Sequence, residues 1–421
     1  MFRIKQSRRE KAAVGIVAKL RRNGYEAYFA GGWARDFLLG RKAKDIDIVS
    51  GAPPDAVRSL FPNSKAIGAA FGVVQVRRYG CEFEVATFRR DYNYRDGRHP
   101  DKVVFSTAEE DATRRDFTIN GLFYDPIENR LIDFVGGRED IRQKIVCAIG
   151  DASARFTEDK LRMLRAVRLA CTLNFTIDEK TWAAVKSFAS DILVVSQERI
   201  RDELSKILSG PDPCRGLDLL WKSGLLEQIL PEAIRPQTDR RFAEMRAVVA
   251  YLRKPSLPLS ISALLYPADD PAGIEPVCRR LKLSSDEVAR VVDILTSREF
   301  LAGPEAIAKS DRTRLAVKPH IMEHLEFCRA RLKAEGQNLR LYARWRKEIE
   351  SLRRKPLPQP LIDGNDLIAL GCKPGPFFKS ILREIEDLQY EGSLTSRLEA
   401  LRYVTERRQR DHVDFIGKKT E

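Results

Sequence analysis

The chain has 421 residues, with 74 Lys and Arg against 60 Asp and Glu, so its formal net charge at pH 7 is +14. Hydrophobic residues make up 43% of the sequence, which supports packed cores and excludes wholesale disorder. No run approaches the ~20 apolar residues of a membrane-spanning helix, so we expect no membrane association. The length predicts roughly two to four domains, and the positive charge favours a polyanionic partner such as a nucleic acid.

Cysteine usage predicts the compartment. Seven cysteines are dispersed without a CxxC pair, and the sequence starts without the apolar segment of a secretory signal. Both features are typical of reduced thiols in the cytosol, so we expect a cytoplasmic protein. His320 and His324 stand at helical spacing, but they lack the HExxH order and a third ligand, so we expect an ordinary helix face there rather than a zinc site.

The first 150 residues alternate between helical and extended patterns. Apolar residues from Ala12 to Leu20 recur at helical spacing and predict a helix closed by Asn23-Gly24. Residues 91–101 are polar and contain glycine, which predicts a mobile loop. The other predicted elements are, in chain order, a strand at 25–30, a helix at 34–39, a strand at 45–49, a hairpin over 71–88 and a strand pair over 121–134.

From Thr157 onward, helical apolar spacing replaces the strand patterns, and proline-bearing segments interrupt it. We therefore expect an α+β fold, with an N-terminal mixed α/β head that contains a small sheet, followed by all-helical domains. The expected boundaries are a catalytic head at 1–150, a neck at 151–210, a body at 211–355 and a tail at 356–421.

The segment 31–47 combines features that suggest chemistry. Gly31 and Gly32 stand between a predicted strand and a predicted helix, where they let the backbone approach a ligand and leave helix-start N–H groups for a phosphate. Arg35 adds guanidinium donors in the first turn. Asp45 and Asp47 are two residues apart on the next strand, so both carboxylates point to one face, where a hard cation such as Mg²⁺ would hold them together. A phosphate cradle beside a two-carboxylate metal site is the arrangement needed for in-line nucleotidyl transfer.

This segment resembles the class II tRNA nucleotidyltransferase and bacterial poly(A) polymerase family, within the polymerase beta superfamily. Two positions depart from the usual family pattern, Ala34 in place of Val and Gly121 in place of Ala. Further stretches resemble the family's other motifs, in the family's order, at 113–121 (TRRDFTING), 133–137 (DFVGG), 158–168 (EDKLRMLRAVR) and 196–204 (SQERIRDEL).

The stretch 158–168 is similar to the family's base-reading helix. Asp159 and Arg162 are three residues apart, so on one helix they would share a face. A carboxylate accepts from the amino group of cytosine or adenine, and a guanidinium donates to the neighbouring ring nitrogen, whereas uracil and guanine present a carbonyl to the carboxylate. The resemblance implies that this pair selects CTP and ATP, and that Arg165 and Arg168 continue the stripe toward the nucleotide.

The resemblance also implies that Arg115 and Asp116 lie against the ribose and phosphates of the nucleotide. Glu84 lies on the predicted hairpin beside the Asp45–Asp47 strand. It is either a third carboxylate that helps to deprotonate the RNA 3′-hydroxyl or a surface partner of a nearby arginine, and the sequence leaves both open. The residues expected to hold the triphosphate are Gly31, Gly32, Arg35 and Asp36.

The leading hypothesis is an enzyme that adds CCA to the 3′ end of tRNA from CTP and ATP, with Mg²⁺ as cofactor. In the family that the sequence resembles, enzymes that add only CC have a shortened loop between the hairpin and the RRD motif. Here residues 90–100 (RDYNYRDGRHP) look full length, so the resemblance argues against CC-only addition. Residues 67–74 match the basic stretch of bacterial poly(A) polymerases poorly. An enzyme that adds only the terminal A is the first alternative, followed by a poly(A) polymerase and a catalytically silent RNA-binding protein. A homodimer is compatible with the sequence, which does not define the oligomeric state.

The C-terminal half is expected to hold tRNA. Residues 329–355 carry many Lys and Arg, with Tyr342 and Trp345 interleaved, and such a face binds phosphates by shape rather than by sequence. Asp363 precedes an apolar run, and we expect it to cap a helix.

Overall fold

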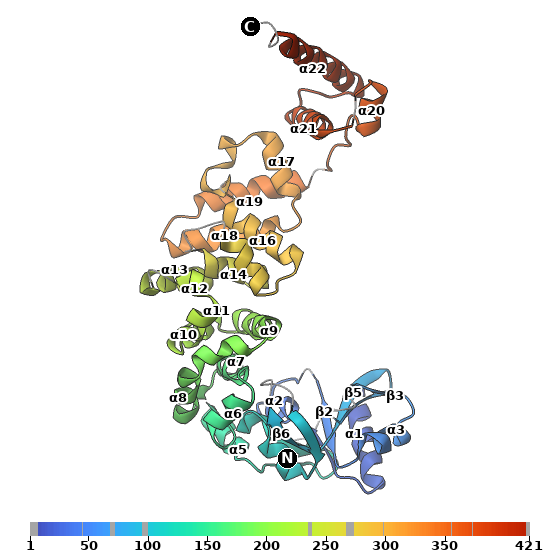
Figure 1. The fold of residues 1–421 in the computed structure, drawn as a ribbon, viewed down its shortest axis with the longest axis vertical. Coiled ribbons are helices and arrows are strands. Elements are labelled where there is room, and N and C mark those ends of the chain that lie inside the picture. Colours follow the sequence, from blue (N-terminus) through green and yellow to red (C-terminus); the bar gives the residue numbers. More distant parts are fainter. Residues whose placement is uncertain are drawn as a thin grey trace. The chain divides into compact units, whose positions relative to one another are not determined.

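The structure is a computed structural model that describes residues 7–43, 45–67, 72–94, 100–234, 238–266, 273–297, 299–354, 356–372 and 374–417. The chain divides into two compact units (Figure 1). The N-terminal unit comprises residues 1–242 and 275–284, and the C-terminal unit comprises 243–274 and 285–421. The further division into head, neck, body and tail stays a prediction.

A seven-stranded sheet forms the centre of the head, in the order β3-β4-β5-β2-β1-β8-β9. Its neighbours are antiparallel except for β2 and β5, which run parallel. Helices pack around it, so the predicted mixed α/β head is confirmed. The described strands are β1 (Ala27–Ala30), β2 (Asp47–Ser50), β3 (Ser64–Ala66), β4 (Val73–Arg78), β5 (Cys81–Thr87), β6 (Arg89–Tyr94), β7 (Pro100–Phe105), β8 (Phe123–Asp125), β9 (Arg130–Ile132), β10 (Ile145–Val146) and β11 (Thr176–Ile177).

The predicted first helix is α1 (Arg8–Arg22), which begins at a capping box formed by Ser7 and Glu10. Its buried face is the predicted one, from Ala12 to Leu20, and it packs on β1, β2 and β5. Arg21 reaches the fully buried carboxylate of Asp125 at 2.7 Å and so attaches the end of α1 to β8. The strand predicted at 45–49 is present as β2 but begins at Asp47, so the prediction that Asp45 lies on it is wrong. The strand pair predicted within 121–134 is present, and so is the hairpin predicted over 71–88 from residue 73 on, with its turn at 79–80, while residue 71 lies outside the described chain.

The predicted loop at 91–101 is wrong for part of its length. Strands β6 and β7 form an antiparallel two-stranded sheet over this segment, while residues 95–99 lie outside the described chain. Backbone pairing satisfies the N–H and C=O groups that the two strands turn toward each other whatever the side chains are, so polar composition alone did not exclude a hairpin.

The motif at 133–137 is a structural turn. The Asp133 carboxylate accepts four backbone N–H groups, from residues 135 to 138, at 2.9–3.1 Å. The turn leads into α5 (Gly137–Gln143), which packs on the 3-10 helix η2 (Thr118–Asn120). At Gly137 a Cβ atom would lie 2.1 Å from the Thr118 carbonyl oxygen, so only glycine permits this contact. Close packing also accounts for Gly121, which stands where the resembled motif usually has Ala, because a Cβ there would lie 2.6 Å from Val135 Cγ2.

Gly137→Ala is expected to lower the free energy of unfolding by about 3 kcal/mol, because its Cβ would meet backbone atoms that cannot rotate away. Gly136→Ala is the matched control. Gly136 has φ +81 but open space around it, so alanine there carries only the left-handed backbone cost of about 1 kcal/mol. Urea unfolding measures both, and an equal or larger loss for Gly136→Ala would contradict this account.

Helices make up the rest of the N-terminal unit, where α7 packs against α9 and α10. The short parallel pair β10–β11, absent from the predicted elements, joins the head to this helical part. The helices of this unit not yet given are α2 (Gly32–Leu38), α3 (Pro54–Leu60), α4 (Ala108–Thr113), α6 (Ala152–Glu158), α7 (Arg162–Leu173), α8 (Glu179–Ser187), η3 (Ala189–Val194), α9 (Gln197–Leu208), α10 (Pro213–Lys222), α11 (Leu225–Ile229) and α12 (Pro231–Ile234).

The described elements of the C-terminal unit are helices, and none of the described helices is both long and apolar enough to cross a membrane. Asp363 caps α20 through a capping box, as expected. Helices α13 (Thr238–Tyr251) and α15 (Ile274–Arg280) cross the boundary between the two units. The described helices that lie wholly in the C-terminal unit are α14 (Leu257–Leu265), α16 (Ser285–Thr296), η5 (Glu299–Leu301), η6 (Pro304–Ala306), α17 (Lys309–Val317), α18 (Ile321–Ala334), α19 (Arg340–Arg353), α20 (Gly364–Ala369), α21 (Pro376–Glu391) and α22 (Arg397–Gly417).

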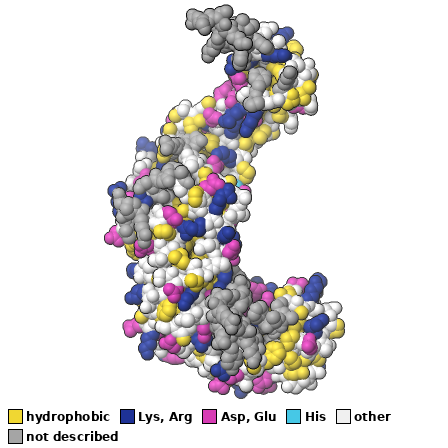
Figure 2. All heavy atoms as spheres, in the orientation of Figure 1, with side chains coloured by type: hydrophobic (Ala, Val, Ile, Leu, Met, Phe, Trp, Pro, Cys, Tyr) yellow, Lys and Arg dark blue, Asp and Glu magenta, His cyan; other side chains and the backbone are white. Residues whose placement is uncertain are grey.

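The basic stretch at 329–355 is partly structural. Trp345 is fully buried, packs against Phe300 and donates to the Ala302 carbonyl at 2.7 Å. Arg329 is 3% exposed and pairs with Glu326 at 2.6 Å. The prediction that Trp345 belongs to an exposed RNA-binding face is therefore wrong. Basic and acidic side chains are intermixed on the face seen in Figure 2.

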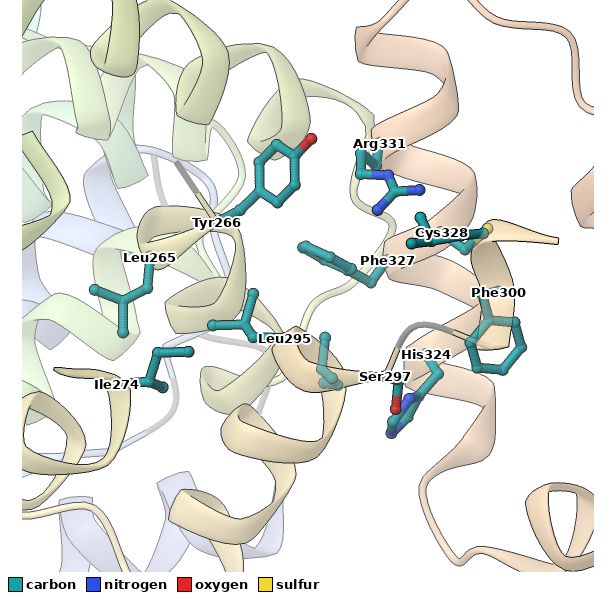
Figure 3. A pocket seen from close by; sticks show the side chains of 12 residues that line it. Leu265, Tyr266, Ile274, Leu295, Ser297, Phe300, His324, Phe327, Cys328 and Arg331 are labelled. Carbon is teal, nitrogen blue, oxygen red and sulfur yellow. The ribbon is translucent and has the colours of Figure 1, made fainter. Parts of the chain in front are cut away.

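His324 belongs to the core of the same unit. It is 3% exposed, its Nε2 lies 3.1 Å from a carboxylate oxygen of Asp293, and it borders a cavity of about 150 Å³ between helices (Figure 3). His320 instead occupies the N-cap of α18. The structure therefore gives the two histidines different surroundings.

Candidate functional site

The glycine pair forms a tight turn between β1 and α2. Gly31 has φ +62, a backbone conformation that favours glycine, and its N–H donates to the Leu122 carbonyl at 3.1 Å. A Cβ at this position would lie 3.1 Å from the Arg115 Nη1 atom, so the guanidinium lies directly against the turn. The turn thus brings side-chain-free backbone and a cation together at one end of β1.

The three candidate carboxylates gather beside this turn. Asp47 is the first residue of β2, and the parallel pairing of Ile48 with Val85 on β5 brings Glu84 next to Asp47 on the same face. Asp45 precedes the strand and is 75% exposed, and Arg9 lies 3.1 Å from it. Glu84 is exposed, and its place beside Asp47 favours the third-carboxylate interpretation over an arginine pair.

Partial burial and the Glu84 carboxylate raise the pKa of Asp47, with Asp45 adding to the effect and Arg115 and Arg9 opposing it. Mutual repulsion among oxygen donors is the electrostatic condition that a bound divalent cation relieves, and carboxylates are the donors that hard cations accept. Among the described residues, no group of three or more His, Cys, Asp or Glu side chains is arranged to hold a metal ion by itself. Two carboxylates can share a divalent cation with the phosphate oxygens of a substrate.

Arg115 connects the turn to the carboxylates. It pairs with the buried Asp111 at 2.9 Å and rests over the Phe123 ring, with its centre 5.1 Å from the ring centroid. Burial disfavours the charged form of Asp111, but Arg115 and Arg114 outweigh it and lower its pKa. The guanidinium of Arg115 is therefore held in place, with one edge toward Gly31 and its field acting on Asp47.

A hydrogen-bonded network runs from the glycine turn to α7. Arg35 donates to Asp36 at 2.9 Å and to the Asn120 side chain at 2.7 Å. Asn120 donates to Asp116 at 3.1 Å, and Arg165 on α7 donates to the other oxygen of Asp116 at 2.8 and 2.5 Å. Arg35 and Arg165, expected to point at the nucleotide, thus make their described contacts with protein groups.

Asp116 is almost completely buried, at 8% exposure. Burial disfavours its charged form, but Arg165, Asn120 and the Phe117 N–H outweigh it and lower the pKa of Asp116 to about 2. A buried and fully paired carboxylate suits a positioning role better than direct contact with phosphates.

Asp116→Asn is expected to lower the free energy of unfolding by roughly 2 kcal/mol at pH 5–7. Because the folded-state pKa lies below the unfolded value, Asp116 contributes stability above about pH 4, and this contribution is lost as the pH falls toward 2. Unfolding curves measured between pH 7 and pH 2 check this. The difference between variant and wild type should shrink below pH 4, and a difference independent of pH would contradict the assignment.

The expected base-reading pair does not lie on one helix. Helix α6 ends at Glu158 and α7 begins at Arg162, and Asp159 between them is extended, at φ −147 and ψ 105. Its carboxylate accepts from the Leu161 N–H at 3.0 Å, a local bond that competes with helix formation. The prediction of a single continuous helix over 158–168 is therefore wrong.

Both side chains of this pair are nevertheless firmly held at the junction. Asp159 accepts from Arg199 at 2.7 Å, while Arg162 pairs with Glu158 at 2.6 Å and donates to the Arg114 carbonyl at 3.3 Å. Asp159 and Arg162 do not pair with each other in these contacts, so each side chain is held by partners of its own.

Sequence reasoning missed supporting residues such as Asn120, Arg199 and Glu203, and it gave Arg168 another role than the one observed. Arg168, expected near the nucleotide, pairs with the buried Glu203 at 2.5 Å and so ties α7 to α9. Burial disfavours the charged form of Glu203, but Arg168 and Lys206 outweigh it and lower its pKa. Asn120, Arg199 and Glu203 all lie inside stretches that resemble family motifs, and that was the only available signal for them.

Two family models match the chain. The model described as "Poly A polymerase head domain" matches residues 27–147, and the model described as "Probable RNA and SrmB- binding site of polymerase A" matches residues 174–235. Together they cover the glycine turn, the carboxylates and part of the helical region.

Similar proteins extend the match over most of the chain. The CCA-adding enzyme of Geobacillus kaustophilus (strain HTA426) is 34% identical over 388 residues, which covers 89% of this chain and 91% of that protein. The CCA-adding enzyme of Geobacillus stearothermophilus is 34% identical over 393 residues, covering 92% and 95%.

Solved structures also match. The crystal structure of the Bacillus stearothermophilus CCA-adding enzyme in complex with CTP has a TM-score of 0.78 at 29% identity and covers 97% of this chain and 100% of that one. The Thermotoga maritima CCA-adding enzyme complexed with tRNA_CCA has a TM-score of 0.66 at 22% identity over 95% of each chain, which supports the fold.

Proposed function

This chain belongs to the class II tRNA nucleotidyltransferase family, the family of the CCA-adding enzymes, and on this premise we propose how its own residues perform the reaction. It is a template-independent nucleotidyltransferase that adds CCA to the 3′ end of tRNA from CTP and ATP, with release of pyrophosphate. The observation that carries the residue assignment is the meeting of Asp45, Asp47 and Glu84 beside the Gly31-Gly32 turn.

We assign Mg²⁺ to Asp45 and Asp47. Bound Mg²⁺ supplies a charge that neutralises the triphosphate and favours loss of the proton from the attacking hydroxyl. Glu84, adjacent to Asp47 on the sheet, is the acceptor for the proton of the tRNA 3′-hydroxyl oxygen.

The triphosphate lies against the glycine turn. Gly31 and Gly32 leave room for it, and Arg115 presents its guanidinium there. Arg35 and Asp36 hold the start of α2 and orient Asn120, so their contribution to phosphate binding is to fix this turn. Asp116 and Arg165 connect the turn to α7. This connection fixes the distance between the triphosphate at the turn and the base at the start of α7.

Asp159 and Arg162 read the base. Arg199 orients the carboxylate, and Glu158 orients the guanidinium, so the pair offers an acceptor and a donor in fixed positions. Cytosine and adenine match this pattern, and uracil and guanine do not. Arg168 acts through Glu203 by holding α7 against α9.

The cytoplasm is the proposed location, because tRNA is the substrate and all seven cysteines are free thiols. The four-part division at residues 150, 210 and 355 is kept as a proposal. It places catalysis in the head, base selection in the neck and tRNA binding in the body and tail.

The test is incubation of the purified protein with tRNA that lacks its 3′ CCA, together with Mg²⁺ and labelled CTP or ATP. Incorporation of both nucleotides is expected. ATP incorporation only on tRNA that already ends in CC would select the A-adding alternative, and long A tails on generic RNA would select the polymerase. No incorporation of either nucleotide would overturn the proposal.

A further inference from the structure

We propose that a hollow on the open face of the head sheet is the subsite for the 3′-terminal strand of the RNA acceptor, with Lys65, Arg77 and Tyr79 as its contacts. This inference rests on the proposed function and adds residues that the family motifs do not include.

One row of side chains leads from the catalytic carboxylates to this hollow. Glu84 on β5 pairs with Gln75 on β4, and Gln75 pairs with Lys65 on β3. Directly paired residues point to the same face, so Asp47, Glu84, Gln75 and Lys65 form one row across four strands. At a strand spacing of about 4.8 Å, Lys65 lies about 14 Å from Asp47, measured along the sheet between backbones.

The hollow occupies the outer end of this row. Its volume is about 630 Å³, and its lining includes Lys65, Gln75, Arg77, Tyr79 and Glu82. The hydrophobic residues that alternate with this row along the same strands, such as Val74 and Val85, point to the opposite face of the sheet and are buried. The hollow is therefore continuous with the face that carries the catalytic carboxylates.

Reaction geometry fixes which substrate comes from this side. The glycine turn lies at β1, on one side of the carboxylates, and β4 and β3 lie on the other. In an in-line displacement the attacking hydroxyl enters opposite the leaving pyrophosphate. Since the triphosphate occupies the β1 side, the acceptor strand has to approach over β5, β4 and β3 (β2, β3 and β5 are labelled in Figure 1).

The chemistry of the hollow suits single-stranded RNA. Lys65 and Arg77 are exposed, and neither has an ion-pair partner within the described parts of the chain, although Arg77 faces Glu82 across the ladder. Glu82 instead accepts from Gln75 at 3.2 Å. Unpaired cations beside an exposed aromatic ring are the features that bind phosphates and stack bases.

Tyr79 provides an independent observation. It has φ +49 at the tip of the β4–β5 hairpin, where asparagine or glycine would be the unstrained choice. The residue is 57% exposed, and the Arg78 guanidinium lies 5.1 Å from the centroid of its ring. A strained position that keeps a large exposed aromatic residue indicates a role for the ring outside the fold.

The decisive experiment compares Lys65→Gln/Arg77→Gln with Arg130→Gln/Arg138→Gln. The control pair is also exposed, has no ion pair within the described residues and includes β9 at the opposite edge of the sheet. For the first pair we expect the KM for tRNA lacking CCA to rise about tenfold while the KM for CTP stays within about twofold. The slope of log affinity against log salt should fall by about 1.4, and the control pair should change neither quantity.

Tyr79→Asn separates binding from folding. Asparagine suits the left-handed turn, so the variant should melt no lower than wild type while its KM for tRNA rises, and Tyr79→Trp should retain wild-type KM. Equal effects of the two double variants would overturn the subsite, as would a rise in the KM for CTP alone, which would assign the hollow to the nucleotide. Direct binding of labelled tRNA tests the hollow even if nucleotide incorporation fails, so the two proposals fail separately.

Discussion

Asp47→Asn is expected to reduce nucleotide incorporation by about 10³-fold or more, with tRNA affinity unchanged within about twofold. Asp47 lies at the centre of the carboxylate group, between Glu84 on the neighbouring strand and Asp45 just before its own strand. Removing its charge removes the donor that would bring a cation against the triphosphate. The basic residues that we propose to bind RNA do not include Asp47, so RNA binding should persist.

The same substitution should leave the fold at least as stable. The charge of Asp47 is opposed by partial burial and by Glu84 and Asp45, so neutralising it relieves repulsion. Thermal unfolding with and without Mg²⁺ checks this. Wild type should be stabilised by the ion, and the variant should not. Asp55→Asn, an exposed aspartate on α3, is the control and should keep both activity and the Mg²⁺ response. Retained activity in Asp47→Asn would refute the metal assignment.

Local chemistry made much of this site predictable. A glycine pair favours a turn, alternation of period two gives a strand, and a two-residue turn gives a hairpin, so the Gly31 turn and the β4–β5 hairpin that carries Glu84 follow from short-range rules. The parallel pairing of β5 with β2, which puts Glu84 beside Asp47, does not follow from them. Even here the extent differs, because the strand begins at Asp47, which leaves Asp45 before it.

Contacts between distant segments were not predictable in the same way. The sequence from Glu158 to Arg168 has an unbroken helical pattern, yet the helix is interrupted between Glu158 and Arg162. At this interruption Arg162 donates to the carbonyl of Arg114 and Asp159 accepts from Arg199, and both partners are distant in the sequence. The connection of Arg35 through Asn120 and Asp116 joins a helix, a turn and a second helix that no spacing rule relates. Trp345 was placed on a surface because its neighbours are basic, whereas burial against Phe300 depends on how helices pack.

Asp159→Ala combined with Arg162→Ala is expected to lower the discrimination of CTP and ATP against UTP and GTP by about 10²-fold. Side-chain pairs that match a base edge contribute about 1–3 kcal/mol of discrimination, and this variant removes both partners. Measuring kcat/KM for each of the four nucleotides on tRNA lacking CCA tests this directly.

The control lies within the same junction. Lys160 stands between the two residues and pairs with Asp191 at 3.3 Å, so Lys160→Ala removes a neighbouring charge without touching the proposed acceptor and donor. It should leave discrimination intact. Because Arg199 orients Asp159, Arg199→Ala should lose part of the discrimination while the rate with CTP falls less than in the double variant. Full discrimination in the double variant, or the same loss in Lys160→Ala, would show that base selection resides elsewhere in the chain.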